Sequence, residues 1–463
     1  MADILDPRQI EEQSQAEQEN YKVYKRRWLV LFATFSVILV VGLHRCIISI
    51  ENILCDYVGM TNEGYEIVLQ ISMYTILLSV LAMARAIDYF GLRRILYLAC
   101  TFILFANGLK ALCCCDEKYV TVWVKDHRYY ILILSELFVG LAQSICLCIP
   151  AKVSSVWFAN YESTLALVIA NCGFNIGIGF SNYFTPVFVK STDDMYKLSY
   201  LFIISGFLVT FIVLTCVTRS SPKMPPSSSA IMSASTLVPL RSGIAVMISD
   251  PNYILLLFTL SILGSSLGVT QFVLEDILQS NHYTNSFCGT LIAHAYFFGT
   301  FFMLMGAAWV DNSANYVKVS RIASIICAIG IATFNISIIL PNIKSVILVT
   351  NVMASFGCSL MYPALFQVCL RSATTILPEA TVSAIIIILQ QIISGLLMNS
   401  FTPLKKLSPE PGGYQAPMLI FSCVVMIISM LYSSSFKAPS RDELQERLRN
   451  WGAPTIMENE IDP

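Results

Sequence analysis

Long apolar runs alternate with short polar segments along most of the chain. Each run holds about twenty residues with few charges, which is the length that a helix needs to cross a hydrocarbon core of roughly 30 Å. The pattern therefore predicts an all-α polytopic membrane protein with twelve transmembrane helices. We expect these helices at residues 28–50, 66–87, 92–115, 129–151, 163–188, 197–217, 252–275, 286–309, 318–340, 344–368, 380–402 and 414–436.

Composition favours a lipid environment over an aqueous one. Hydrophobic residues make up 56% of the 463 residues and charged residues only 13%, and a soluble protein could not bury that much apolar surface. The net charge of -1 indicates no nucleic-acid partner. The 15 cysteines lie mostly within apolar runs and lack the spacing of a zinc site, so we expect no metal and no other cofactor.

Charge distribution and a polar linker divide the chain into two halves. Most of the 29 Lys and Arg residues face the cytosol if both termini lie there, in agreement with the positive-inside rule. A stretch rich in Ser and Pro separates the sixth helix from the seventh. We therefore expect a cytosolic N-terminal tail at 1–27, a six-helix bundle at 28–217, a cytosolic linker at 218–250, a second six-helix bundle at 251–436 and a cytosolic C-terminal tail at 437–463. Two such bundles are the plan of an alternating-access carrier.

An acidic residue lies just past the expected end of the second helix of each half. The first loop reads Ala-Arg-Ala-Ile-Asp-Tyr-Phe-Gly-Leu-Arg-Arg and contains Asp88, Gly91, Arg93 and Arg94, and the second half has Asp311 at the equivalent place. This loop resembles the signature of the major facilitator superfamily, which implies a two-bundle transporter fold. Gly91 permits a tight turn, and either acid can meet an arginine or a helix N-terminus when the inner gate closes. We assign these five residues to gating.

A second resemblance involves the fourth and fifth helices and the segment before the first helix. Pro-Ala-Lys-Val-Ser-Ser-Val-Trp-Phe at 150–158, Lys-Arg-Arg-Trp at 25–28 and Gly-Phe-Asn-Ile-Gly at 173–177 resemble solute carrier family 49, the feline leukaemia virus subgroup C receptor-related (FLVCR-like) family. The resemblance implies a divergent member of that family. Its relatives are linked to choline and ethanolamine uptake, to haem export and, in a lysosomal branch, to other small cations.

The resemblance also implies positions in the substrate cavity. In choline-carrying relatives two aromatic residues enclose the ammonium group by cation–π attraction, and their positions fall here at Gly42 and Gly268. Two glutamines of the family fall at Asn175 and at Gln391, or at Gln390 if one gap is placed differently. These amides can bond a solute, or they can instead hold helices together. The aromatic cage is therefore absent, while the amides are kept.

The first helix carries an arginine within its apolar run. An arginine there costs about 2.5–3.5 kcal/mol on insertion scales and normally faces a cavity or a partner. Arg45 shares a helical face with Gly42 and Ser49. We expect Arg45 to line the pathway and to pair with Glu136, at similar depth in the fourth helix, although either side chain could instead snorkel to the outer surface. Further cavity candidates are Asn171 and Gln271, with His294, Tyr296 and Gln367 as weaker ones.

These features together predict a secondary transporter that works by alternating access. By resemblance its substrate is a small organic solute such as choline, ethanolamine or haem, but the missing cage and Arg45 favour an anionic or larger neutral solute. The alternative is a non-transporting receptor or regulatory membrane protein with the same fold. We expect no enzyme, because the sequence shows no nucleophile with a nearby base and no phosphate loop. We expect a monomer in the plasma membrane, or in a lysosomal or other organelle membrane, whose partners are the solute and the lipid bilayer.

Overall fold

The structure is a computed structural model of the 463-residue chain. It describes residues 22–116, 121–226, 240–281, 283, 285–313, 315–340, 343–373, 376–404 and 413–437. Most of the expected tails at 1–27 and 437–463, and part of the expected linker, lie outside the described residues. Every regular element of the described part is a helix.

Twelve helices of the described chain are long and apolar enough to cross a membrane, so the predicted all-α, twelve-span fold is confirmed. Apolar runs of this length form helices because only a backbone that satisfies its own hydrogen bonds is stable in hydrocarbon. The spans of the first half are α2 (Arg27–Leu43), α4 (Asn62–Phe90), α5 (Leu92–Cys113), α7 (Arg128–Trp157), α8 (Ser163–Phe188) and α9 (Tyr196–Cys216). Those of the second half are α12 (Pro251–Ser280), α13 (Asn285–Asp311), α14 (Tyr316–Ile339), α15 (Lys344–Ala373), α16 (Glu379–Leu404) and α17 (Gln415–Ser435).

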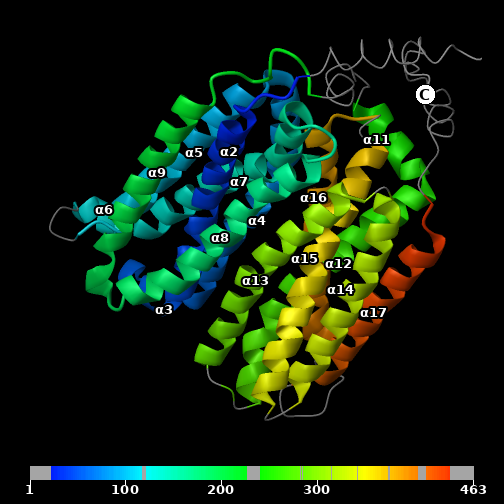
Figure 1. Ribbon diagram of the computed structural model, residues 1–463. Helices are drawn as coiled ribbons and strands as arrows, with labels where there is room; N and C mark the ends of the chain where they lie inside the picture. Colours follow the sequence, from blue (N-terminus) through cyan, green and yellow to red (C-terminus); the bar gives the residue numbers. More distant parts are fainter. Residues whose placement is uncertain are drawn as a thin grey trace, which may run out of the picture.

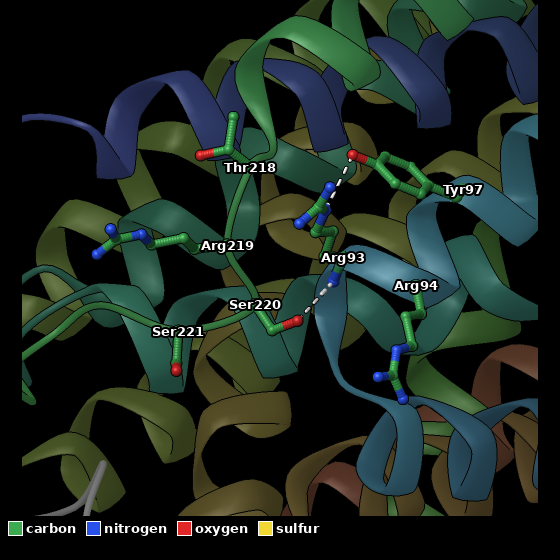
Figure 2. A pocket seen from close by; sticks show the side chains of 7 residues that line it. All are labelled: Arg93, Arg94, Tyr97, Thr218, Arg219, Ser220 and Ser221. Atoms are coloured by element: carbon green, nitrogen blue, oxygen red, sulfur yellow. Dashed lines mark hydrogen bonds between the residues drawn. The ribbon is translucent and has the colours of Figure 1, made fainter.

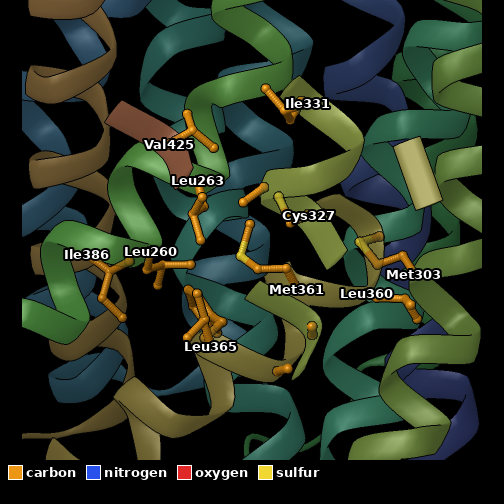
Figure 3. Close-up of a cluster of buried hydrophobic side chains, with 14 of the residues drawn as sticks. Leu260, Leu263, Met303, Cys327, Ile331, Leu360, Met361, Leu365, Ile386 and Val425 are labelled. Atoms are coloured by element: carbon orange, nitrogen blue, oxygen red, sulfur yellow. The ribbon is translucent and has the colours of Figure 1, made fainter. Parts of the chain in front are cut away.

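The spans form two groups that lie side by side, one drawn blue to green and the other green to red (Figure 1). Short helices link consecutive spans: η1 (His44–Ile50) and α3 (Glu51–Val58) follow α2, α6 (Val122–Asp126) precedes α7, η2 (Thr192–Asp194) precedes α9, and α11 (Leu240–Ser249) precedes α12. Each group has an apolar interior, and both interiors extend to a few residues of the other group. Figure 3 shows the interior of the second group, where Leu263 of α12, Cys327 of α14 and Met361 of α15 are buried together.

Small residues let particular spans approach closely. A Cβ atom added to Gly173 of α8 would lie 2.5 Å from the backbone oxygen of Phe35 in α2, and one added to Gly357 of α15 would lie 2.6 Å from the Cα of Cys327 in α14. Lipid gives helices no hydrophobic reason to associate, so close backbone packing at small residues supplies much of the attraction. These contacts fix α2 on α8 and α14 on α15.

The first span differs from the prediction of one helix over 28–50. Its α-helix ends at Leu43, and the chain continues as the 3-10 helix η1. At the change, the N–H of His44 donates to the carbonyls of Gly42 and Val41, which tightens the turn. The spacing of side chains around the axis therefore changes at His44, and an α-helical face cannot be continued beyond it.

The expected linker at 218–250 also differs from a purely irregular segment. Its second part forms the short apolar helix α11. Gly243 of α11 lies directly against the side chain of Leu377, just before α16. The segment therefore packs on the second group of spans.

The two groups touch at one end of the molecule. This is the end where α9 leads into residues 217–226, and we call it the linker end. There α8 packs against α13, and α16 packs against α4 and α7.

Candidate substrate cavity and gate

A cavity of about 280 Å³ lies between the two groups of spans. Its walls come from α2, α7 and α8 of the first half and from α12, α13 and α15 of the second. The lining includes the polar residues Gln143, Asn171, Asn175, Gln271 and Ser359 and the aromatic residues Phe174, Tyr296 and Tyr362. Within the described part of the chain, no Lys, Arg, Asp or Glu lines it. The cavity is therefore polar and aromatic but uncharged.

Four carboxamides give the cavity its hydrogen-bonding capacity. Asn171 and Asn175 lie one turn apart on α8 and so share a face. Neither they nor Gln143 and Gln271 have a hydrogen-bond partner among the residues that the structure describes. The buried amide of Asn335 behaves differently, because it accepts from Thr270 and donates to Ser422. Asn335 holds helices together, whereas the cavity amides are free to bond a solute.

The two glycines at the family's cage positions lie in different surroundings. A Cβ atom added to Gly268 would meet nothing within 4 Å, and Gly268 lines the cavity. Gly42 does not line it, contrary to prediction. A Cβ atom there would lie 2.6 Å from the carbonyl oxygen of Phe174, because Gly42 is part of the close α2–α8 contact. The side chain that α2 contributes to the cavity is Ile38, one turn earlier.

The two glutamines of α16 do not form part of the described lining, although we expected one of them there. Gln390 lies next to a lining residue, since its Nε2 atom is 3.1 Å from the position of a Cβ atom on Gly264. Gly264 itself lines the cavity. Gln391, the next residue along α16, is also absent from the lining.

The predicted ion pair between Arg45 and Glu136 is wrong. A carboxylate oxygen of Glu136 lies 2.6 Å from the Nζ of Lys110 on α5, and both side chains are almost fully buried. Lys110 also donates to the carbonyl of His44 at 3.4 Å, at the point where the α-helix of the first span gives way to η1. The partner of Glu136 is therefore the cation that supports this break.

Arg45 lies in η1 rather than on an α-helical face shared with Gly42 and Ser49. It makes no hydrogen bond or ion pair with any residue in the described part of the chain. It is not among the residues that line the cavity. The side chain of Ser49 lies outside what the structure describes.

Asp88 joins the two groups of spans at the linker end. One carboxylate oxygen lies 3.3 Å from the Nζ of Lys152 on α7, and the other accepts from the hydroxyl of Thr381 on α16 at 2.8 Å. Lys152 also lies 3.3 Å from a carboxylate oxygen of Glu379, the first residue of α16. One lysine thus bridges an acid of each half, and all three charged side chains are at most 13% exposed.

Asp311 makes a second contact across the linker end. Its two carboxylate oxygens accept from the backbone N–H groups of Thr164 and Leu165, at 3.2 and 2.8 Å. These N–H groups belong to the first turn of α8 and have no partner within the helix. The positive end of the helix dipole attracts the carboxylate further. Asp311 at the end of α13 therefore binds a helix N-terminus of the other half.

The remaining gating candidates lie beside this closure rather than in it. Gly91 has φ +77, so it forms the tight turn between α4 and α5. Arg93 donates from its Nε to the hydroxyl of Tyr97 at 3.0 Å and makes no contact with Asp88. Arg94 is exposed. The cation that meets Asp88 is Lys152, which the sequence motif contained but to which we assigned no role.

The fold and the site define a class of protein: a membrane transport protein with two helical bundles around a central cavity. The sequence profile of the Major Facilitator Superfamily matches residues 29–398, and the chain belongs to this family. Its members are generally transporters and not enzymes.

The low sequence identity of its relatives indicates that the chain is a divergent member of this family. The choline/ethanolamine transporter FLVCR2 of Rattus norvegicus is 24% identical over 355 residues, which cover 72% of this chain and 62% of the rat protein. Solute carrier family 49 member A3 of Danio rerio is 24% identical over 451 residues, 91% of this chain and 89% of that protein. The chain thus spans less than two thirds of the length of the rat transporter. The predicted resemblance to solute carrier family 49 is confirmed.

Solved structures show the same fold. A double-tryptophan mutant of XylE matches with a TM-score of 0.67 at 11% identity, over 93% of this chain and 100% of that one. The human organic anion transporter MFSD10 matches with a TM-score of 0.62 at 14% identity, over 88% of this chain and 100% of that one. At such low identity these similarities concern the fold alone.

Proposed function

We propose that this protein is a secondary, alternating-access transporter of a small polar organic solute of the amino-alcohol type. The solute binds in the central cavity, between the two groups of spans. The observation that supports this most directly is the set of four carboxamides that face the cavity without partners in the described chain. Unpaired amides in a membrane interior are costly, so a cavity that keeps them is suited to a hydrogen-bonding solute.

The lining also favours an alcohol or an organic cation over an anion. Phe174, Tyr296 and Tyr362 line the cavity, and the face of an aromatic ring attracts an ammonium group. Arg45 is not part of the lining, so the expectation of an anionic solute loses its main support. Among the described residues, the lining has no Lys or Arg for the carboxylates of haem and no His ligand for its iron. The name of the rat relative, a choline/ethanolamine transporter, agrees with this choice.

The closed linker end supports a carrier over a static receptor. Asp88 joins the two halves through side-chain contacts, and Asp311 joins them through hydrogen bonds to a helix N-terminus. Both kinds of contact can break when the halves move apart. A rocking motion of two bundles needs such breakable contacts at one end. With the linker end in the cytosol, as the excess of Lys and Arg there favours, the cavity is shut off from the cytosol.

Uptake measurements test the proposal. Cells that produce the protein should accumulate labelled choline or ethanolamine faster than control cells, and an untargeted metabolite comparison covers other amino alcohols. Asn175→Ala or Gln271→Ala should each lower apparent affinity by roughly tenfold to a hundredfold, the worth of a hydrogen bond to a charged group.

The matched control is Asn399→Ala, which removes an exposed amide on α16 and should leave uptake unchanged. If the metabolite profile of producing cells equals that of control cells, the non-transporting receptor is the better description.

A further inference from the structure

A second hollow lies on the surface at the linker end, away from the central cavity (Figure 2). It is open, with a volume of about 580 Å³, and it lies between the start of α5 and the segment that follows α9. Three arginines contribute to its lining, Arg93 and Arg94 from α5 and Arg219 from the segment, together with Tyr97 and three hydroxyl residues, Thr218, Ser220 and Ser221. No acidic residue of the described chain lines it. We call this hollow the arginine pocket.

The guanidinium groups of the arginine pocket have few partners in the protein. Arg93 uses its Nε atom on Tyr97 and lies over the ring at 5.4 Å, which leaves its terminal nitrogens free in the described contacts. Arg94 and Arg219 are exposed and make no hydrogen bond or ion pair with the part of the chain that the structure describes. Arginines of the second half at the same end are engaged, because Arg321 donates to the carbonyl of Phe436 and Arg371 lies over Tyr316.

The walls of the arginine pocket are fixed by contacts to three spans. The hydroxyl of Ser220 accepts from the backbone N–H of Arg93 at 3.3 Å, and its carbonyl accepts from the indole of Trp157 at 3.2 Å. The hydroxyl of Tyr97 donates to the carbonyl of Val217 at 3.1 Å. The segment is thus held on α5, α7 and the end of α9. The pocket is a defined feature of the fold rather than a chance grouping of surface cations.

This chemistry is that of a phosphate site. Guanidinium groups bind phosphate oxygens through paired, charge-assisted hydrogen bonds, and the first turn of α5 adds a positive helix end. The pocket lies where two spans leave the membrane, and α9, which ends just before the segment, exposes Phe207, Phe211 and Leu214 along its length. Acyl chains can lie along that apolar face while the headgroup enters the pocket, and basic clusters at this level attract anionic lipids.

We propose that the arginine pocket binds the phosphomonoester group of an anionic phospholipid headgroup. The site is separate from the solute cavity and does not depend on which solute is carried. A bound headgroup contacts both the α4–α5 turn and the segment at 218–221, because a Cβ atom on Gly91 would lie only 3.2 Å from the hydroxyl of Ser220. The bound lipid therefore stabilises the α4–α5 turn at Gly91, which lies three residues after the gating residue Asp88.

The test measures binding by the purified full-length protein, with no transport step. Probes are vesicles of phosphatidylcholine containing phosphatidylinositol bisphosphate, vesicles containing phosphatidylserine at equal charge, and soluble inositol phosphate. We expect tightest binding to the bisphosphate vesicles. Arg94→Ala with Arg219→Ala should weaken that binding by roughly 25-fold, the worth of two basic residues near a charged membrane surface. Arg94→Lys with Arg219→Lys keeps the charge and should lose only the part due to paired hydrogen bonds.

The matched control is Lys318→Ala. Lys318 is an exposed cation in the first turn of α14, the equivalent helix of the second half, and its loss should change binding little. If soluble inositol phosphate competes for the pocket as strongly as the lipid does, the pocket binds phosphate groups but its ligand is not a lipid. Equal weakening by the Lys318 variant, or equal binding of all vesicles of the same charge, overturns the pocket as a specific site.

Discussion

The two halves close the linker end with equivalent acids but with different chemistry. Asp88, at the end of α4, meets the other half through side chains, namely the cation Lys152 and the hydroxyl of Thr381. Asp311, at the end of α13, meets the other half through two backbone N–H groups of α8. The first contact therefore depends on the identity of three or more side chains. The second needs only one carboxylate and a helix terminus.

The difference comes from the cation available in each half. Lys152 on α7 lies 3.3 Å from both Asp88 and Glu379. Arg371, near the end of α15, instead lies 4.8 Å from the centre of the Tyr316 ring and forms no ion pair with Asp311 in the described contacts. A repeated acid thus keeps its place in the fold while its partner changes. Substitutions should consequently affect the two contacts unequally.

The largest effect should follow from Lys152→Met. Without the lysine, Asp88 and Glu379 face each other as nearly buried carboxylates, and removing one partner of a buried ion pair costs about 3–5 kcal/mol. The closed linker end should lose that much free energy relative to an open one. Distances between spin labels on the linker ends of α4 and α16 should lengthen. Lys152→Arg keeps the charge and should preserve the short distance, and an unchanged distance in the methionine variant would show that the lysine does not hold this end.

A buried ion pair that lies within one bundle serves as a comparison for the Lys152→Met variant. Lys110→Met leaves Glu136 buried without its cation and should lower the free energy of unfolding by about 3 kcal/mol. Because both residues belong to the first half, the spin-label distance between α4 and α16 should not change. Thermal denaturation measures the loss, and Lys110→Met with Glu136→Leu should recover most of it. No recovery in the double variant would mean that the pair is not the cause.

Much of the fold could be predicted from local pattern. Apolar runs of the right length become spans because hydrocarbon requires internal backbone hydrogen bonds, and the acids Asp88 and Asp311 are recognisable from their repeated place after the second helix of each half. The change to a 3-10 helix at His44 was not predictable in the same way. It is stabilised by Lys110, a residue of another helix.

The partners of the charged residues could not be derived from spacing. Lys152 and Glu379 are 227 positions apart, and only the packing of α7 against α16 brings them together. Glu136 was matched to Arg45 by depth in the membrane, and depth leaves the direction around the helix axis open. Lys110 was visible as a second cation inside an apolar run, and two interior charges of opposite sign are a signal for pairing. The family resemblance predicts Gly42 in the cavity, whereas close contact with α8 determines its position.

A smaller effect is expected for Asp311→Asn. An asparagine keeps one acceptor oxygen for the N–H groups of Thr164 and Leu165 but loses the charge that favours the helix terminus. The closed linker end should lose about 1–2 kcal/mol. The same spin-label measurement, with labels on α8 and α13, reports the change. A loss as large as that of Lys152→Met would contradict the unequal chemistry of the two contacts.

The smallest effect is the coupling between the two contacts. Lys152 contacts Asp88 and Glu379, whereas Asp311 contacts the backbone N–H groups of Thr164 and Leu165, so Lys152→Met and Asp311→Asn should add within about 0.5 kcal/mol. Lys152→Met and Asp88→Asn remove the same ion pair, and their joint effect should fall short of the sum by about 0.5–3 kcal/mol. Both cycles use the free energy of linker-end closure from the spin-label populations. Strong coupling in the first cycle would mean that the halves close as one inseparable unit, whereas additivity means that two independent contacts hold the gate.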